Sequence, residues 1–114
     1  MNLPEKLREA LDEDLDTAGD IEDALENGGQ LFQHTSGESF MVCEVHKHSR
    51  ARLVYCWLFG GDLDELLDMI PYAEDWGREN GCDYAEFQGR IGFTRVLGKL
   101  GYEYSAAVMR KRLN

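Results

Sequence analysis

Apolar residues in the first 29 positions recur at the spacing of amphipathic helices. Over residues 4–16 leucines fall at every fourth position, which predicts a helix with a narrow apolar stripe and an acidic opposite face. A second short helix is expected from Asp20 to Asn27, again with its apolar residues on one side. The sequence Asn27-Gly28-Gly29 should end it, because glycine readily adopts the left-handed conformation found after helices.

From residue 30 the apolar period changes to two, which is the spacing of strands. Strands are predicted at residues 30–34, 39–47 and 52–59, with turn-forming residues between them, and this pattern indicates an antiparallel meander. The third run is apolar at almost every position from Leu53 to Phe59. Such a run predicts a strand that is covered on both faces and lies centrally in its sheet.

A longer amphipathic helix is predicted from Asp62 to Asn80, with Asp62 as its N-cap and Glu65 three residues further on. Pro71 falls inside this pattern, so we expect a kink or a break into two segments there. The remaining pattern predicts a strand at 82–88, a helix at 91–100 that Gly101 ends, and a last alternating strand at 102–113.

The predicted order α-α-β-β-β-α-β-α-β, with two N-terminal helices, is that of an α+β protein with a mixed sheet. The third strand, the long helix and the fourth strand should form a parallel crossover. One domain is expected over residues 1–114, because a chain of this length can bury a single core. Its parts are an acidic helical part at 1–29, the meander at 30–61 and a helix-strand-helix-strand half at 62–114.

Charge argues against one class of partner. The net charge is −10, whereas nucleic-acid binding normally needs a basic face, so no nucleic-acid partner is predicted. The charge is uneven, since residues 1–29 hold ten acids and two bases and residues 78–114 hold seven bases and four acids. The two ends could therefore face different partners, or each other.

No apolar run is long enough to cross a bilayer, and the N-terminus has no basic segment followed by an apolar one. We therefore expect no membrane partner and a cytoplasmic location. Cys43, Cys56 and Cys82 are odd in number and widely spaced. This spacing predicts free, largely buried thiols, with neither a zinc site nor a disulfide framework.

The second half of the chain resembles a known family. Gly81-Cys82 after a helix, the run Gly89–Leu97 and Leu100-Gly101-Tyr102 before the last predicted strand are similar to the closing half of the GCN5-related N-acetyltransferase (GNAT) fold. The likeness extends over residues 30–113 and implies a GNAT-like mixed sheet. It is greatest to small GNAT-like proteins of tailed bacteriophages, some of which resemble internal virion proteins of podoviruses.

GNAT enzymes hold the pyrophosphate of coenzyme A on backbone N–H groups of a glycine-rich loop at a helix N-terminus. The corresponding loop spans residues 57–64, and it lacks the basic residue with which the family's loop begins. Its acids at 62, 64 and 65 stand where a diphosphate would need positive potential, so a tight turn with a helix cap is the structural alternative. The resemblance implies that the cofactor would contact four residues, Phe59, Gly60, Gly61 and Arg90.

The family's acid catalyst is a tyrosine that protonates the departing thiolate, and Leu97 occupies that position here. Glu44 and Tyr104 are the remaining catalytic candidates, Glu44 as a general base and Tyr104 in place of the missing tyrosine. Arg90 has the alternative of a salt bridge to a nearby acid. His46 and His48 share one face of a strand but lack a third ligand at a suitable spacing, so no metal site is predicted.

Two functional hypotheses follow from the resemblance. In the first, the chain is a degenerate, non-catalytic GNAT-like protein that binds a protein partner. If it is phage-encoded, it is a virion component or an inhibitor of a host factor, found in the virion or in the bacterial cytoplasm. In the second, it is an acyl-CoA-dependent N-acetyltransferase with acetyl-CoA as cofactor. Leu97 and the missing basic residue favour the first hypothesis.

Overall fold

The computed structural model describes residues 5–12, 15–89 and 91–114. Its elements follow the order α-α-β-β-β-α-β-α and end in a short 3-10 turn, η1. The helices are α1 (Glu5–Glu9), α2 (Ala18–Glu26), α3 (Leu63–Glu79) and α4 (Ile91–Leu97), the strands are β1 (Gln30–Gln33), β2 (Phe40–Lys47), β3 (Arg52–Gly60) and β4 (Tyr84–Phe87), and η1 is Gly98–Leu100.

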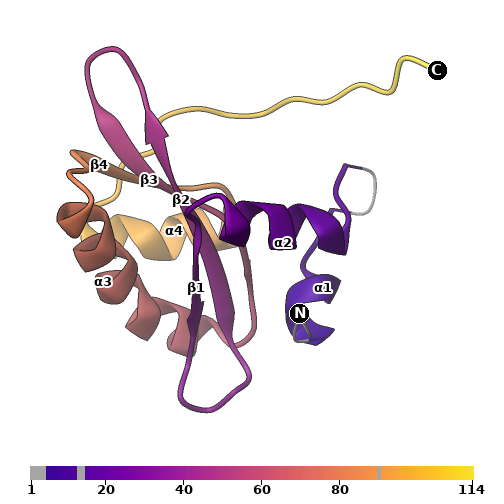
Figure 1. The fold of residues 1–114 in the computed structure, drawn as a ribbon, viewed down its shortest axis with the longest axis horizontal. Helices are drawn as coiled ribbons and strands as arrows, with labels where there is room; N and C mark the ends of the chain where they lie inside the picture. The colour runs from indigo at the N-terminus through magenta and orange to yellow at the C-terminus, as the bar shows by residue number, and fades with distance from the viewer. Residues whose placement is uncertain (1–4, 13–14, 90) are drawn as a thin grey trace.

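The four strands form one mixed sheet in the order β1-β2-β3-β4 (Figure 1). β1 and β3 each run antiparallel to β2, whereas β4 runs parallel to β3 after the crossover through α3. The predicted meander and parallel crossover are therefore confirmed. β3 has a strand on either side, and Val54, Cys56 and Leu58 are buried in it, as its continuous apolar run predicts.

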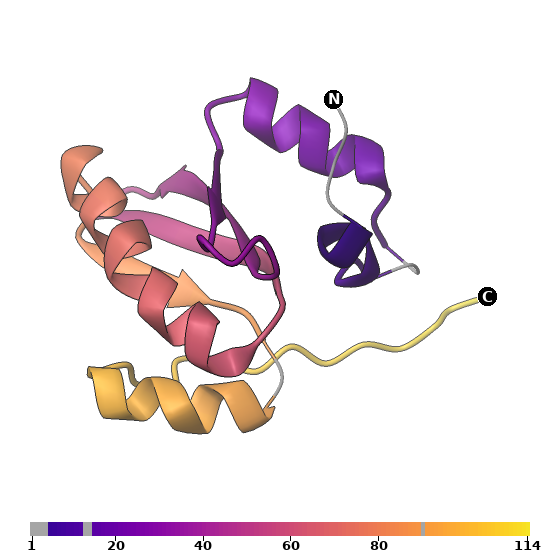
Figure 2. The same cartoon turned by 90° about the horizontal axis from the view of Figure 1, so that it is seen from below.

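Helices cover both faces of this sheet (Figure 2). On one face, α3 and α4 pack against β2 and β3, for example through Ile70 and Phe93 with Met41. On the other face, Ile21 of α2 packs with Phe40, Val42 and Leu58, and residues following α1 join the same cluster. Because successive strand residues point to opposite faces, β2 contributes alternately to the two clusters.

Helix α3 begins at the predicted N-cap but is not broken at Pro71. The carboxylate of Asp62 accepts a hydrogen bond from the Glu65 backbone N–H at 3.2 Å, which confirms Asp62 as the N-cap. The prediction of a break at Pro71 was wrong, because α3 is a single helix from Leu63 to Glu79. Buried residues on both sides of the proline, such as Ile70 and Ala73, pack on the sheet and stabilise the helix across the missing hydrogen bond.

The first predicted helix is shorter than its leucine pattern suggested, because α1 ends at Glu9. The Leu11 backbone N–H bonds to Arg8 in a tight turn, Leu11 then packs in the core, and Leu15 is exposed. The second helix agrees better with its prediction. Thr17 and Asp20 form a capping box at its start, and Gly28 adopts the expected left-handed conformation after its end.

The prediction of a last strand at 102–113 was wrong. After η1 and the left-handed Gly101, residues 102–114 form no regular element, and beyond Tyr102 the chain runs away from the sheet (Figures 1 and 2). Alternation along a chain favours a strand only when a neighbouring strand accepts its backbone hydrogen bonds. We call residues 103–113 the C-terminal tail.

Within the described part of the chain, no helix is both long and apolar enough to cross a membrane. Among the same residues, no three His, Cys, Asp or Glu side chains are grouped so that they could hold a metal ion.

Candidate functional site

The loop between β3 and α3 is where the resemblance places a cofactor, and its second glycine, Gly61, is needed for packing. Gly61 has φ of +127°, a value that side-chain-bearing residues rarely adopt. A Cβ atom at this position would lie 2.6 Å from the Cα of Ser39, in the turn that leads into β2. Gly61 is therefore required for the close approach of two backbones, whether or not a ligand binds there.

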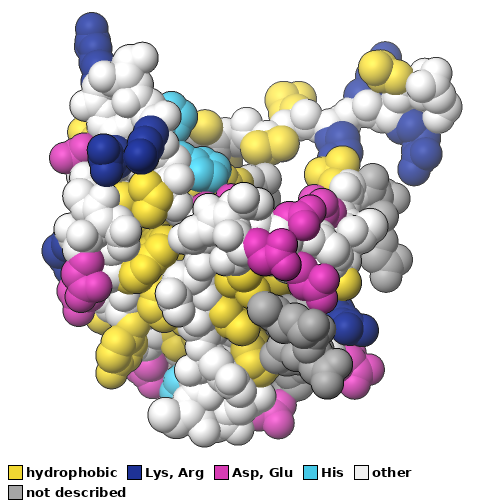
Figure 3. All heavy atoms as spheres, viewed as in Figure 1, with side chains coloured by type: hydrophobic (Ala, Val, Ile, Leu, Met, Phe, Trp, Pro, Cys, Tyr) yellow, Lys and Arg dark blue, Asp and Glu magenta, His cyan; other side chains and the backbone are white. Residues whose placement is uncertain are grey.

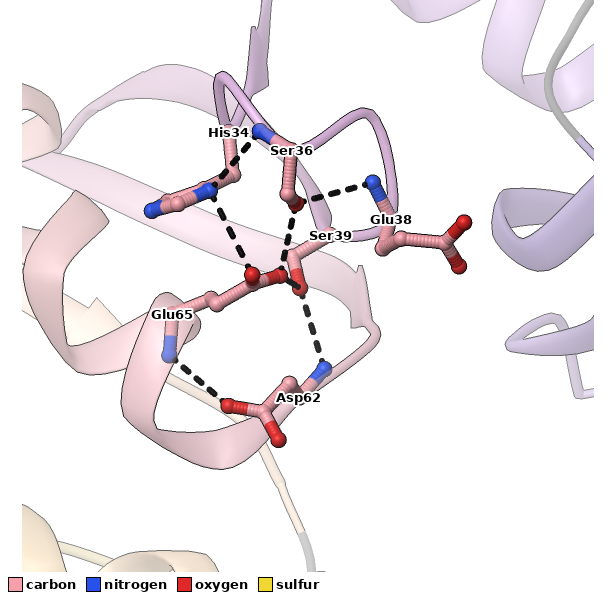
Figure 4. Close-up of polar contacts among 6 residues, drawn as sticks. All are labelled: His34, Ser36, Glu38, Ser39, Asp62 and Glu65. Carbon is pink, nitrogen blue, oxygen red and sulfur yellow. Dashed lines mark hydrogen bonds and ion pairs between the residues drawn. The ribbon is translucent and has the colours of Figure 1, made fainter.

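The backbone N–H that follows this glycine is already engaged inside the protein (Figure 4). The Asp62 N–H donates to the Ser39 hydroxyl at 3.0 Å, and that hydroxyl donates in turn to Glu65 Oε1 at 2.7 Å. Ser39 is completely buried. The start of α3 is thus held by Ser39, from the turn that leads into β2, and by its own Asp62 cap, with the carboxylate of Glu65 beside them.

Two further residues of the β1–β2 turn join this cluster (Figure 4). The Ser36 hydroxyl donates to the same Glu65 oxygen at 2.9 Å, and its backbone N–H donates to His34 Nδ1 at 3.1 Å. His34 Nδ1 lies 3.5 Å from Glu65 Oε2. We call Ser36, Ser39, His34 and Glu65 the Glu65 cluster.

The Glu65 cluster holds the residue types of a hydrolytic triad in the wrong arrangement. In a triad, the histidine contacts the nucleophilic hydroxyl and the carboxylate orients the histidine. Here both serine hydroxyls donate to the carboxylate, and His34 Nδ1 accepts from a backbone N–H. The cluster therefore joins the β1–β2 turn to α3. The sequence signals were only the turn residues at 35–38 and a serine before an apolar strand, so it escaped prediction.

Aromatic rings occupy the space at the carboxyl ends of the two parallel strands. β3 and β4 pair as far as Cys56 and Phe87, and ligands of open α/β sheets commonly bind beyond such ends. The Phe59 ring lies 4.5 Å from that of Phe93 and 6.2 Å from that of Phe87, between ring centroids. A Cβ atom on Gly89 would lie 2.6 Å from the Phe59 ring. Phe59, a predicted cofactor contact, packs against both of these rings.

The other predicted site residues are dispersed. Gly60 ends β3 and is half-buried, whereas Arg90 lies outside the described residues. Glu44, on β2, has its carboxylate 4.0 Å from His46 Nε2. Tyr104 is exposed in the C-terminal tail. No contact that the structure describes joins Glu44 to Tyr104, so the two catalytic candidates do not form a pair.

Neither residue near the family's proton-donor position is suited to that role. Leu97 is buried in the core. The Tyr102 hydroxyl donates to Glu74 Oε2 at 2.8 Å, and burial, followed by this carboxylate, raises the pKa of the phenol well above its ordinary value. A phenol with a raised pKa holds its proton more firmly, which makes it a poorer acid.

The three cysteines are not disulfide-bonded. Cys43 and Cys56 are free, buried and opposite one another across β2 and β3, and Cys82 is free and half-buried. Burial is the main cause that raises the pKa of Cys56 and of Cys82. The prediction of free, largely buried thiols is therefore confirmed.

A separate acidic cavity of about 340 Å³ lies between α2 and the sheet. Glu44 and the Trp57 indole form its sheet side, and acidic side chains of the α2 region gather around it (Figure 3). Such a concentration of carboxylates produces a negative potential that attracts cations. Its lining residues are Asp16, Asp20, Asp23, Ala24, Asn27, Glu44 and Trp57.

The sequence and the fold were compared with those of known proteins. No family model matches the sequence, and no curated protein matches it. Among solved structures, an acetyltransferase from Trypanosoma brucei superposes with a TM-score of 0.64 at 16% identity, over 83% of this chain and 77% of that one. Glucosamine-6-phosphate N-acetyltransferase from Arabidopsis thaliana superposes with a TM-score of 0.62 at 12% identity, over 92% of this chain and 80% of that one.

These superpositions show a GNAT-like fold. The resemblance seen in the sequence is confirmed at that level, as is the α+β class with a mixed sheet. The identities are too low to carry an activity from those proteins to this chain.

Proposed function

We propose that this chain is a degenerate GNAT-like protein that transfers no acyl group and acts by binding a protein partner. The observation that carries the proposal is the hydrogen bond from the Asp62 N–H to the buried Ser39 hydroxyl. A backbone N–H at the start of α3 is therefore used within the protein's own fold. A coenzyme A loop would instead offer such N–H groups to the phosphates of the cofactor.

Electrostatics at the same loop support the proposal. Asp62, Asp64 and Glu65 lie in the first turn of α3 or cap it, and the loop 57–64 contains no lysine or arginine. Carboxylates stabilise a helix N-terminus, but they repel a diphosphate that would have to sit on the same turn. Phe59 packs against the core and fills space at the end of β3. Leu97 is buried in the same core and stands where the family has its proton-donating tyrosine.

The proposed source and partner rest on the resemblance of the sequence alone. From its resemblance to small phage-encoded GNAT-like proteins we infer a virion component or an inhibitor of a host factor. Such a protein would work in the bacterial cytoplasm or in the virion. Its partner is a protein rather than nucleic acid, because the net charge is −10.

An acyl-CoA-dependent N-acetyltransferase is the second candidate. Its support is the likeness to solved acetyltransferases, together with the glycine pair Gly60-Gly61 that the loop retains. In that case acetyl-CoA would contact this loop and Arg90, and Glu44 or Tyr104 would move the proton. A cationic amine would find a favourable potential at the acidic cavity that Glu44 lines.

Calorimetric titration with acetyl-CoA separates the two candidates. We expect no heat of binding at millimolar ligand, either for the natural chain or for Glu65→Gln, which removes a negative charge from the first turn of α3, beside the loop, at nearly constant shape. Micromolar binding with defined stoichiometry, tightened in Glu65→Gln, would establish a cofactor site at this loop and overturn the proposal. The protein partner is tested by affinity capture from host lysate, followed by reconstitution of a stoichiometric complex from purified components.

A further inference from the structure

The hairpin between β2 and β3 carries the opposite charge from most of the chain. Residues 46–52 hold two histidines, one lysine and two arginines without any acid, in a chain whose net charge is −10. At its tip, the His48 N–H donates to the Ala51 carbonyl at 2.9 Å and closes a tight turn. This tip extends beyond the rest of the sheet (Figure 1), and Figure 3 shows Lys and Arg side chains at the same end of the molecule. We give the name basic hairpin to its three bases, Lys47, Arg50 and Arg52.

Within the described part of the chain, no carboxylate neutralises the basic hairpin. All three of its side chains are exposed, and the ion pairs that the structure describes join other residues. The Asp83 carboxylate lies close by, but it accepts its hydrogen bond from the Arg52 backbone N–H, at 3.1 Å. The three bases are therefore open to anionic groups of another molecule.

Two of these bases repel one another. In the register of β2 and β3, Lys47 stands directly opposite Arg52, and like charges at opposed positions destabilise a pair of strands. Arg52 has a structural reason for its charge, because its guanidinium lies beside Gly81, just past the end of α3, where the helix dipole favours a cation. Lys47 has no such neighbour among the described residues. An anionic group that contacts both bases would remove their repulsion.

We propose that the basic hairpin is the surface on which the protein partner docks, and that the partner contributes a segment rich in aspartate or glutamate. The inference rests on the proposed function, since it names the surface and the chemistry of that partner. Guanidinium groups pair bidentately with carboxylates, and clusters of arginine recognise acidic motifs. The hydrogen-bonded turn holds the bases in position before binding, which reduces the entropy lost on association.

The distribution of charge favours an acidic protein segment over nucleic acid. A nucleic acid is charged along its whole length, so it would also meet the acidic remainder of this chain. A segment with a few carboxylates needs to contact only the hairpin. The attraction of unlike charges then steers the encounter toward this one end of the molecule.

The primary test is the binding of a fluorescently labelled oligoglutamate peptide to the full chain, measured by fluorescence anisotropy at low ionic strength. We expect saturable binding that weakens as salt is added, because salt screens exposed charges. The double variant Lys47→Gln with Arg50→Gln should raise the dissociation constant at least about fivefold. The matched control, Arg95→Gln with Lys99→Gln, loses two exposed bases of α4 and η1 and has the same net charge. It should bind the peptide within about twofold of the natural chain.

Three results of this titration would overturn the proposal. The first is no binding up to millimolar peptide. The second is equal weakening in the two double variants, which would make net charge decisive rather than the hairpin. The third is tighter binding of an oligonucleotide with the same number of charges, lost in the hairpin variant, which would assign the hairpin to nucleic acid.

A ligand-free measurement tests the repulsion itself. Lys47→Glu places a carboxylate opposite Arg52, so the thermal midpoint of unfolding should rise by a few degrees. Lys111→Glu, at an exposed position of the C-terminal tail, should leave the midpoint unchanged. A lower midpoint for Lys47→Glu would show that this lysine stabilises the fold, and it would overturn the assignment of Lys47 to partner binding.

Failure of the hairpin is distinguishable from failure of the proposed function. If the oligoglutamate peptide and acetyl-CoA both fail to bind, the hairpin proposal falls and the proposed function stands, because the partner could occupy another surface. Micromolar binding of acetyl-CoA would overturn the proposed function whatever the hairpin binds.

Discussion

The fully buried Ser39 hydroxyl donates a hydrogen bond to Glu65 Oε1 at 2.7 Å, joining the turn before β2 to the first turn of α3. The same oxygen of Ser39 accepts from the Asp62 N–H. One hydroxyl thus satisfies a helix-start donor and a carboxylate at the same time. The glycine loop between them is held in place from inside the protein, and this is why we assign it a structural role.

Replacing Ser39 with alanine should lower the free energy of unfolding by about 1–3 kcal/mol, because the part-buried Asp62 N–H and the Glu65 carboxylate each lose a partner. Urea denaturation measures the change. Ser36→Ala is the matched control, since Ser36 is exposed and binds the same oxygen. Water can replace its hydroxyl, so the control should lose less than about 1 kcal/mol. Equal losses in the two variants would contradict the structural role of Ser39.

Gly61→Ala should destabilise the protein more than Gly28→Ala. Both glycines have positive φ, at +127° and +95°, so both variants incur backbone strain of about 1–2 kcal/mol. Only at Gly61 does the added methyl group meet another backbone, that of Ser39, while a Cβ on Gly28 meets nothing within 4 Å. The difference between the two variants, again from urea denaturation, should be about 1–3 kcal/mol. Similar losses would show that the loop can move away from β2.

Local patterns predicted those features that depend on local chemistry. The apolar run from Leu53 to Phe59 identified β3 as an inner strand, because only a strand covered on both faces needs apolar residues at every position. Asp62 was recognisable as an N-cap for a similar reason, since capping depends on the first turn alone. These predictions needed no knowledge of distant residues.

Predictions failed where the answer depended on distant parts of the chain. The alternation at 102–108 resembles that of a strand, but a strand exists only beside another one, and the sequence does not show that the tail leaves β4. The Glu65 cluster joins residues 26 to 31 positions apart, through serines that look like turn residues. Phe59 is a cofactor contact only by the resemblance, and its packing could not be predicted from the loop alone because the rings around it come from β4 and α4.

Phe59→Ala should reduce stability by about 2–4 kcal/mol, because it removes a half-buried ring that packs on Phe93 and Phe87. Tyr72→Ala provides a control of similar size on the exposed surface of α3, and it should cost less than about 0.5 kcal/mol. Both values follow from denaturant titration. If Phe59 faced a functional cleft instead, its loss would leave stability nearly unchanged.

Alkaline pH should reveal the hydrogen bond from Tyr102 to Glu74. Burial and this carboxylate raise the folded-state pKa of Tyr102 above the ordinary value of 10, so the folded protein retains a proton that the unfolded chain releases. The corresponding stability is complete below pH 10 and falls as the pH rises further, by up to about 1.4 kcal/mol per pH unit. Tyr102→Phe removes this ionisation, and its stability should therefore depend less steeply on pH above 10. Tyr104→Phe, at an exposed tail position, should keep the slope of the natural protein. Parallel slopes for Tyr102→Phe and the natural protein, measured by urea denaturation from pH 8 to 11, would show that Tyr102 ionises equally in both states.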